Sequence, residues 1–600
     1  MESTQPVHIY RQMLSIVRLA RTAYSPYKRE IAILTVLGLV GGILEGIGIN
    51  AVIPLLTFML GLQNPATDML SRAIQTFFAF IHVPFVPKYL LSFIVLLFLG
   101  KAAVTLLLGR IQVRITTEYE RKTRAKLFEK VLNASWPYLL KQKLGNLETL
   151  LMIDTPCATS LLVKISFSIL IATNLIMYLL VAFSISALVT LTTFALGALT
   201  FITLRPLLDR VHDFSRDRAV LYRDTLHHVT EHVSGLKTVK ALGVEKAAIE
   251  KGNTLFEGIK VRSAKIQILQ QVAGQAVAPI GVLYIAGILS LAFKTPFISL
   301  AALPSILYLV YRIFTYVQQM QNNVQYMSEL APHLERVVFY ESDAESGAAD
   351  TSGNRPFRFE KELSFNNVSF AYTPGRDVLR DMSFKVPKGS LLGIVGPSGA
   401  GKTTCIDLLL RLLVPAGGSI TIDGVDIQTI SLENWRNRVG YVSQEPFIIH
   451  DTIRNNVRFY DQSVSDSEIW EAAKKAHIEE FIKKLPEGLN TVVGSRGISI
   501  SAGERQRIVI ARALARKPEL LILDEATSAL DNESEAHIKR VIEDLKGKIT
   551  IIAIAHRLST IMGSDLLVAL KDGTVVEIGR PQELLRDSAS YFSRVYSINA

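Results

Sequence analysis

Long apolar stretches alternate with strongly polar ones over the first half of the chain. The apolar stretches run near residues 31–60, 90–108, 161–183, 185–204, 272–293 and 297–317. Each is close to the roughly 20 residues that an α-helix needs to cross the hydrocarbon core of a bilayer. The pattern predicts a membrane α-helical bundle of six transmembrane helices within residues 1–343. An even number of spans leaves both ends of this region on the same side of the membrane.

Two connections between the spans, residues 109–160 and 205–271, are unusually long and contain few helix breakers. We expect the spanning helices to continue through them, to leave the membrane and to turn near residues 133–144 and 230–242. Turns in these places would contact a soluble domain and carry its movements into the membrane. The alternative is a pair of independent hairpins.

Two amphipathic segments flank the first span. One has its apolar residues on a single helical face, which is typical of a helix lying along a membrane surface: Ile9, Met13, Ile16 and Val17. The other, on the opposite side of the membrane, repeats apolar residues at offsets of three and four: Leu70, Ile74, Phe77, Phe78 and Ile81. Packing is the favoured role of this external helix, and contact with lipid or with an amphipathic substrate is the alternative.

The net charge of +11 allows two interpretations. Basic residues collect on nucleic-acid-binding surfaces, and they also collect on the cytoplasmic side of membrane proteins. Here residues 110–143 and 205–265 are rich in Lys and Arg, whereas residues 61–88 contain one Arg and one Lys. Because 49% of all residues are hydrophobic, this distribution favours a membrane protein. We expect the long connections to be cytoplasmic, membrane lipids to be partners, and nucleic acid not to be one.

Four ionisable residues interrupt the apolar spans: Glu45, Lys101, Lys164 and Arg312. Charged side chains within a span are costly and often functional. The two lysines can also extend their ammonium groups towards the membrane surface. Glu45 should face the interior of the bundle, where a structural hydrogen bond to neighbouring helices is favoured over a role in substrate binding or gating.

After a linker at residues 344–356, strands and helices alternate through residues 357–600. A buried strand at 390–395 runs into the pattern G-x-x-x-x-G-K-[ST], which opens a helix. Glycines let backbone N–H groups approach a phosphate, the lysine neutralises it, and the threonine hydroxyl suits Mg²⁺. The pattern predicts a cytosolic α/β P-loop NTPase domain. Its expected ATP-binding residues are Gly396, Pro397, Ser398, Gly399, Ala400, Gly401, Lys402, Thr403 and Thr404, with Thr403 also a metal ligand.

An acidic pair follows another apolar strand, at residues 520–523. Ligands of α/β sheets bind at the carboxyl ends of the strands, so this pair should face the phosphate loop. We expect Asp524 to hold Mg²⁺ through water and Glu525 to polarise the attacking water, since phosphoryl transfer needs positioning and charge stabilisation. The chain is therefore predicted to hydrolyse ATP.

With these motifs the chain resembles the ABC transporter family over nearly its whole length. Further elements stand in the family's order: Tyr372, Gln444, residues 500–507, residues 528–531 and His556. The resemblance implies that Tyr372 stacks on adenine, that Gln444 contacts Mg²⁺ and the catalytic water, and that His556 lies near the γ-phosphate. It also places further residues in the nucleotide site: Ser501, Gly503, Glu504 and Asp531.

The signature segment departs from the family's Leu-Ser-Gly-Gly-Gln, because Ile500, Ala502 and Glu504 replace three of its five residues. Ser501 and Gly503 remain, and the resemblance makes them contacts of the γ-phosphate. Ala502 adds a methyl group at a tight approach, and Glu504 adds negative charge near the nucleotide. Ser495 also stands where many exporters of the family carry a glutamate. These departures bear on turnover and coupling rather than on ATP binding.

One membrane half fused to one ATP-binding half resembles an exporter-type half-transporter. The resemblance implies a dimer that sandwiches ATP between the phosphate loop of one subunit and the signature of the other, and the complete catalytic set favours a homodimer over a heterodimer. Residues 45–56 resemble the first span of lipid-linked oligosaccharide flippases. We therefore expect ATP-driven flipping of such a glycolipid in a bacterial inner membrane. A multidrug or peptide exporter is the alternative, and Glu525 and His556 disfavour a non-pumping ATP-gated regulator.

Overall fold

The computed structural model describes residues 18–59, 69–142, 144–292, 303–346, 353–494, 500–526, 531–554, 557 and 561–596. The expected surface helix with Ile9 and Val17 lies outside these residues. The chain divides into two compact units. The helical unit contains Met1–Ala134 and Lys141–Ala348, and the α/β unit contains Ser135–Leu140 and Ala349–Ala600.

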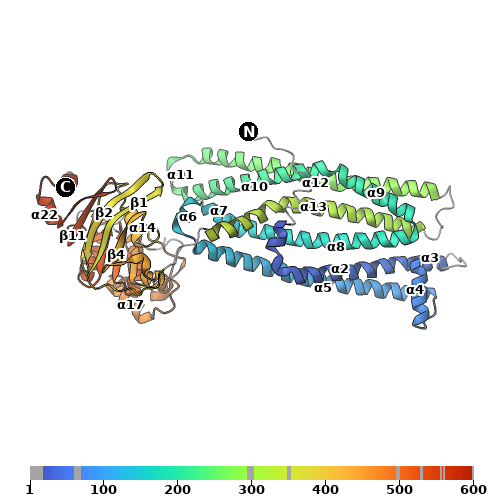
Figure 1. Ribbon diagram of the computed structural model, residues 1–600, viewed down its shortest axis with the longest axis horizontal. Helices are drawn as coiled ribbons and strands as arrows, with labels where there is room; N and C mark the ends of the chain where they lie inside the picture. The colour runs from blue at the N-terminus through green and yellow to red at the C-terminus, as the bar shows by residue number, and fades with distance from the viewer. Residues whose placement is uncertain are drawn as a thin grey trace. The chain divides into compact units, whose positions relative to one another are not determined.

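The helical unit is built from long α-helices that lie side by side (Figure 1). In chain order they are η1 (Ser25–Tyr27), α2 (Lys28–Asn50), α3 (Val52–Met59), α4 (Met69–Phe80), α5 (Pro87–Leu132), α7 (Leu144–Thr149), η2 (Leu150–Asp154), α8 (Thr155–Ile185), α9 (Ala187–Thr203), α10 (Arg205–Ser234), α11 (Leu236–Leu242), α12 (Glu245–Ala292) and α13 (Leu303–Ser346). Figure 1 shows α2 along α5 and α8 along α13, in agreement with their contacts.

The predicted membrane spans are only partly settled by the described residues. Four helical segments there are long and apolar enough to cross a membrane: Ser25–Met59, Pro87–Leu132, Asn146–Ile185 and Glu245–Ser290. Helix α9 is apolar but shorter, and the start of the sixth expected span lies outside the described residues. The membrane-spanning character is clear, and the count of six stays a prediction.

Three helices, α5, α12 and the 44-residue α13, are much longer than a bilayer is thick. Helix α5 has 46 residues and α12 has 48. At 1.5 Å per residue each is about 70 Å long, against a hydrocarbon core of about 30 Å. Short helices follow the ends of α5 and α10, namely α6 (Trp136–Lys141) and α11. The expected helical continuations with turns near residues 133–144 and 230–242 are confirmed, and the alternative of independent hairpins is wrong.

A glycine at every fourth position lets α2 approach α8 closely. A Cβ atom on Gly38 would lie 3.1 Å from Leu170 Cδ1, one on Gly42 would lie 2.9 Å from Asn174 Oδ1, and one on Gly46 would lie 3.1 Å from Val181 Cγ2. Small residues at this spacing are a common device of helix packing in membranes, where backbones gain contact by close approach. The stripe brings the neighbouring Glu45 close to α8.

The external helix α4 is fixed mainly by packing. Ile74 and Phe78 are buried in a cluster with Ala51 and Leu90, and the Phe78 ring contacts Phe85, Phe93 and Phe77 edge-on. The favoured packing role is confirmed for these two residues. Phe77 and Ile81 are 45% and 43% exposed, so part of the predicted apolar face is uncovered.

The α/β unit contains a mostly parallel six-stranded sheet of order β12-β11-β3-β10-β9-β6 and an antiparallel sheet of order β2-β1-β4-β5. The strands are β1 (Glu362–Thr373), β2 (Arg376–Pro387), β3 (Leu391–Val395), β4 (Gly417–Ile422), β5 (Val425–Asp426), β6 (Val439–Val442), β7 (Asp451–Thr452), β8 (Val492–Val493), β9 (Leu520–Asp524), β10 (Thr550–Ile554), β11 (Leu566–Lys571) and β12 (Thr574–Gly579). Every residue of β3, β9 and β10 is buried, which explains their continuous apolar runs.

The helices of this unit lie between and after its strands, some of them in succession. They are α14 (Lys402–Leu409), η3 (Ile427–Thr429), α15 (Leu432–Arg438), α16 (Ile453–Arg458), α17 (Asp466–Lys475), α18 (Glu479–Lys484), η4 (Gly488–Asn490), α19 (Ala502–Ala515), α20 (Asn532–Leu545), α22 (Pro581–Arg586) and α23 (Tyr591–Tyr596). Helix α13 of the other unit continues to Ser346, so the first three residues of the expected linker 344–356 are helical.

Candidate nucleotide site and membrane charge cluster

The predicted phosphate loop joins β3 to α14, and its glycines are required by the backbone. Gly396 and Gly401 have φ of 155° and 96°. A Cβ atom would overlap the Leu570 carbonyl oxygen at Gly396 and Leu379 Cδ2 at Gly401. Gly399 has φ of 82° and open space around it. The loop therefore keeps a conformation that leaves its outer side free to receive an anion at the start of a helix.

Lys402 folds back across the loop. Its Nζ donates to the carbonyl oxygens of Gly396 at 2.8 Å and Pro397 at 3.1 Å. Burial lowers the pKa of Lys402, and the nearby carboxylates of Glu525 and Asp524 oppose that shift. The ammonium is thus held at the mouth of the loop, where a phosphate would replace the carbonyl oxygens as its partner.

Acidic groups gather at the ends of β9 and α14. Asp524 is the last residue of β9, and burial together with Glu525 raises its pKa. Burial and Asp524 raise the pKa of Asp407, on α14, to about 6. Sequence reasoning missed Asp407, although its position one turn after Thr403 was a usable signal. Carboxyl groups whose charge is so poorly compensated fit a site that takes up a cation.

Glu525 is positioned by its backbone and by Gln444. Its φ is +46°, in the left-handed region that a glutamate rarely adopts, and its N–H donates to the Ile554 carbonyl oxygen at 3.1 Å. Gln444 Nε2 donates to Glu525 Oε2 at 2.8 Å. The structure thus brings these two predicted catalytic residues together. Backbone strain of this kind often marks functional sites.

The predicted Mg²⁺ ligands suit a hard divalent cation. Thr403 is exposed in the first turn of α14, and Asp524 and Gln444 add a carboxylate and an amide oxygen. The described residues contain no cluster of three or more His, Cys, Asp or Glu arranged to hold a metal. Magnesium usually takes one or two carboxylates and completes its shell with water and phosphate oxygens, and Asp524 is the one carboxylate among these three predicted ligands.

Tyr372 lies next to the phosphate-loop helix. Its hydroxyl is 3.3 Å from the Thr404 hydroxyl, and its ring is 47% exposed. Phe370 packs edge-on against it with ring centroids 5.0 Å apart. The ring therefore presents an open face beside the loop, as adenine stacking requires.

The signature segment begins α19 with a capping box. Ser501 N and Oγ donate to Glu504 Oε2 at 2.8 and 2.7 Å, and Glu504 N donates to Ser501 Oγ at 3.2 Å. Glu504, expected as a charge near the nucleotide, thus also has a structural role. Gly503 faces Ser534 on α20, and Asp531 caps α20 by accepting from Ser534 N at 3.4 Å.

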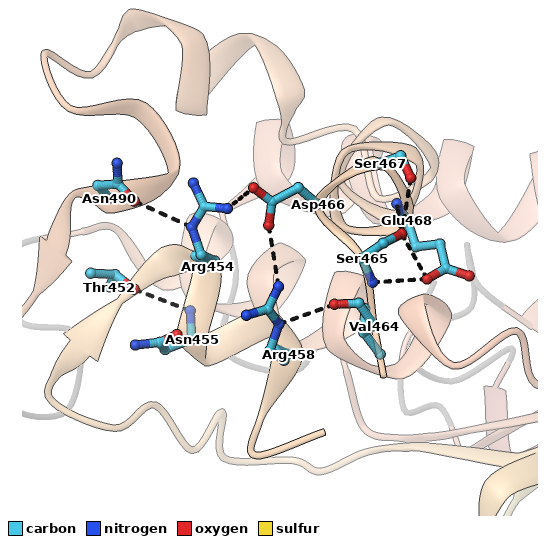
Figure 2. A network of polar contacts seen from close by, with 10 residues as sticks. All are labelled: Thr452, Arg454, Asn455, Arg458, Val464, Ser465, Asp466, Ser467, Glu468 and Asn490. Carbon is cyan, nitrogen blue, oxygen red and sulfur yellow. Dashed lines mark hydrogen bonds and ion pairs between the residues drawn. The ribbon is translucent and has the colours of Figure 1, made fainter. Parts of the chain in front are cut away.

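The segment after Gln444 is held by a polar network (Figure 2). Asp466 pairs with Arg454 and, at 3.2 Å, with Arg458. The Nε of Arg458 also donates to the Val464 carbonyl oxygen at 3.0 Å. Thr452 caps α16, and Ser465 and Glu468 form a capping box on α17. Sequence reasoning missed this network, although Ser465-x-x-Glu468 is a recognisable box.

Some predicted residues cannot be placed. His556, residues 528–530 and Ser495 lie outside the described residues. Neighbouring Arg557 is described and pairs with Glu535 on α20.

Three of the four ionisable residues of the spans meet in one cluster. Glu45 is 2% exposed, and its carboxylate lies 2.5 Å from Lys101 Nζ and 2.7 Å from Arg312 Nη2. Arg312 also donates to the hydroxyls of Tyr178 at 3.3 Å and Tyr316 at 3.1 Å. The expectation that Glu45 bonds to neighbouring helices is confirmed.

The lysines behave differently from each other. The sequence allowed Lys101 to extend its ammonium group towards the membrane surface. In the structure this group pairs with Glu45 instead. Lys164 stays outside the cluster, and its Nζ lies over the Tyr326 ring, 4.3 Å from the centroid. The two tyrosines of the cluster were missed, because nothing in their spacing distinguishes them from other aromatic residues of the spans.

Two family models match this chain. The model described as "ABC transporter" matches residues 379–528, and the model described as "ABC transporter transmembrane region" matches residues 51–296. Together they contain the phosphate loop, the signature and most of the predicted spans.

Individual relatives match over different lengths. The heterocyst differentiation ATP-binding protein HepA of Nostoc sp. is 30% identical over 580 residues, 93% of this chain and 92% of that protein. The ATP-dependent lipid A-core flippase of Desulfotalea psychrophila is 38% identical over 371 residues, 60% of this chain and 64% of that protein. ATP-binding cassette sub-family B member 5 of Mus musculus is 44% identical over 245 residues, 40% of this chain and 20% of that protein.

A solved structure has the same fold. The structure of a bacterial Atm1-family ABC exporter with ATP bound matches with a TM-score of 0.75 and 24% identity, over 96% of this chain and 98% of that one.

Proposed function

The chain belongs to the ABC transporter family, and on this premise we propose that it flips a lipid-linked oligosaccharide or a related glycolipid across a bacterial inner membrane. ATP hydrolysis in the α/β unit is coupled to transport through the helical unit. The similarity to an ATP-dependent lipid A-core flippase supports a lipidic substrate.

A band of amide side chains on α13 carries the proposal. Six of the eight residues that directly follow the predicted sixth span are Gln or Asn: Gln318, Gln319, Gln321, Asn322, Asn323 and Gln325. Gln321 is 0% exposed, and neither its Oε1 nor its Nε2 has a hydrogen-bond partner among the described residues. Buried amides are almost always hydrogen-bonded. Gln318 and Asn323 already donate to other residues, namely to the Gly274 and Lys164 carbonyl oxygens and to Ser168 Oγ. We propose that the remaining amide groups of the band bond to sugar hydroxyls, while the apolar helices around it suit a lipid chain.

We infer that two copies of the chain form the working transporter. In each site, Lys402 and the phosphate loop of one copy would bind the phosphates, and Ser501 and Gly503 of the second copy would complete the contact with the γ-phosphate. Glu525, held by Gln444, would orient the attacking water, and His556 would lie near the γ-phosphate. The residues that would hold Mg²⁺ are Thr403, Gln444 and Asp524; the ion would stabilise charge on the phosphates.

The test is ATP-dependent movement of a fluorescent polyprenyl-diphosphate glycolipid between the leaflets of proteoliposomes. We expect movement with the wild type and none with Glu525→Gln, and we expect the glycolipid to stimulate ATP hydrolysis in nanodiscs. Stimulation by drugs or peptides alone would support the exporter alternative. Hydrolysis with no movement of any lipid would contradict flipping and support a regulator.

A further inference from the structure

The charge cluster in the spans is unbalanced. It combines one acidic side chain, Glu45, with two basic ones, Lys101 and Arg312, and draws them from three helices, α2, α5 and α13. The other described partners are the neutral hydroxyls of Tyr178 and Tyr316. An excess positive charge among apolar helices is costly, and such charges usually have a counter-ion. One further anion would neutralise this cluster.

The cations have unused donors. The described hydrogen bonds of Arg312 use Nε and Nη2, and its guanidinium also lies over the rings of Tyr178 and Tyr316. Its Nη1, which carries two N–H groups, has no hydrogen-bond acceptor among the described residues. The described partner of Lys101 Nζ is Glu45 alone, although an ammonium has three donors. A phosphate oxygen has the geometry to accept from both an arginine fork and an ammonium.

Access to the cluster is from the side of the cations. The side chains of Lys101 and Arg312 are 27% and 22% exposed, whereas Glu45 is 2% exposed. Tyr308, four residues before Arg312 on the same helical face, is 40% exposed and adds a hydroxyl donor. A group that approaches from the exposed side of Lys101 and Arg312 meets these two cations before it meets the buried carboxylate.

We propose that Arg312 and Lys101 bind the phosphate group of the transported amphipath, and that Glu45 is an internal counter-anion with which this phosphate competes. The proposal rests on the proposed function and specifies the charge of its substrate. Because Glu45 already holds both cations, the arriving phosphate has to take over part of their pairing. The competition makes a prediction of opposite sign for the two partners: loss of the carboxylate strengthens binding, and loss of a cation weakens it.

The experiment measures binding of radiolabelled farnesyl diphosphate to the full chain in phosphatidylcholine nanodiscs without nucleotide. Farnesol and inorganic pyrophosphate serve as competitors that carry the chain or the anion alone. Pyrophosphate also has access to the phosphate loop, so the difference between the wild type and Arg312→Gln isolates the membrane site. Lys164→Gln is the matched control, because it removes a cation of the spans that lies outside the cluster.

We expect Arg312→Gln and Lys101→Gln to weaken binding about tenfold, Glu45→Gln to tighten it severalfold, and Lys164→Gln to leave it unchanged. Arg312→Lys, which keeps the charge, should retain part of the affinity if Arg312→Gln fails to assemble. Farnesol should not compete. Pyrophosphate could also compete for the part of the binding that the wild type has and Arg312→Gln lacks. Such competition would show that the anion alone is sufficient for binding at the membrane site.

Several results would overturn the inference. Equal weakening by Glu45→Gln and Arg312→Gln would show that the cluster is structural. Equal competition by farnesol and farnesyl diphosphate, or no binding to the wild type, would show that no phosphate site exists. All variants could also bind farnesyl diphosphate as the wild type does and still flip the glycolipid. That result would refute the phosphate site but would leave the proposed function standing.

Discussion

Replacing Gly503 by alanine should separate α19 from α20 and slow ATP hydrolysis. A Cβ atom at this position would overlap Ser534 Oγ and would lie 2.6 Å from Ser534 Cβ. Because Gly503 is buried and both contacts come from a helix packed against α19, one of the two helices has to shift. Overpacking of this kind typically costs about 1–3 kcal/mol.

Ser534→Gly is the matched second substitution. It removes both overlapping atoms, and the remaining Ser534 Cα would lie 3.7 Å from the new Cβ, which is ordinary contact. The substitution keeps the backbone N–H that donates to Asp531. Alone it should cost about 0.5–1 kcal/mol, since glycine lowers helix stability. If overlap is the cause, the double variant should lose about that amount only and should be more stable than Gly503→Ala by up to about 2 kcal/mol.

Thermal unfolding of the purified chain in nanodiscs and steady-state ATP hydrolysis measure the two consequences. One kcal/mol corresponds to about 2–4 °C in Tm for a domain of this size. A Tm of Gly503→Ala equal to that of the wild type, or no recovery with Ser534→Gly, would refute the steric argument. Recovery of Tm without recovery of hydrolysis would assign Gly503 a direct contact with the nucleotide.

Three further outcomes can be checked on the same preparation. Asp466→Ala removes two ion pairs of the network in Figure 2, and the side chain of Asp466 is 52% exposed. Because exposed ion pairs contribute little, urea unfolding should show a loss of about 0–1 kcal/mol in the free energy of unfolding. A larger loss would mean that the network acts cooperatively. The raised pKa of Asp407, about 6, lies above the value of about 3.9 expected when unfolded. Stability without nucleotide should therefore fall as pH rises from about 4 to about 6 and then level off, and a pH series of Tm should show no such fall for Asp407→Asn. Gly42→Ala should lower Tm by several degrees because its Cβ would lie 2.9 Å from Asn174 Oδ1, whereas Gly109→Ala, with no atom within 4 Å, should melt with the wild type.

The catalytic part of the α/β unit could be predicted in most of its detail, because its chemistry is local in the chain. The phosphate loop and the acidic pair each follow an apolar strand directly, and the parallel sheet brings their ends together. Gln444 could be assigned only through the family resemblance, since its 2.8 Å bond to Glu525 joins residues far apart in the sequence. The spacing from Thr403 points to Asp407, but its raised pKa depends on burial beside Asp524, which the spacing does not show.

The charge cluster of the helical unit, in contrast, could not be predicted from the sequence. The sequence identified Glu45, Lys101 and Arg312 as costly residues of the spans, but periodicity does not say which helices are neighbours. Each charge taken alone has a plausible separate role, such as extension of a lysine to the membrane surface. The carboxylate comes within reach of both cations only because α2 packs against α5 and α8 while α13 packs against α8. The Gly38–Gly42–Gly46 stripe contributes the close approach of α2 to α8.

The replacement of the signature glutamine by Glu504 leads to a last prediction. The single hydroxyl proton of Ser501 is bonded to Glu504 Oε2 at 2.7 Å, so Ser501 has to leave this carboxylate before it can donate to a γ-phosphate held by a second copy. A hydrogen bond to a charged acceptor is stronger than one to a neutral amide by about 1 kcal/mol, so Glu504→Gln should lower KM for ATP about fivefold. Glutamine also suits the third helical position of a capping box, so Tm should not change. Steady-state hydrolysis over a range of ATP concentrations measures KM, and an unchanged value would show that Ser501 does not have to break its bond to Glu504 to bind nucleotide. A fall in Tm with unchanged KM would mean that the carboxylate is retained for the charge that it places at the start of α19.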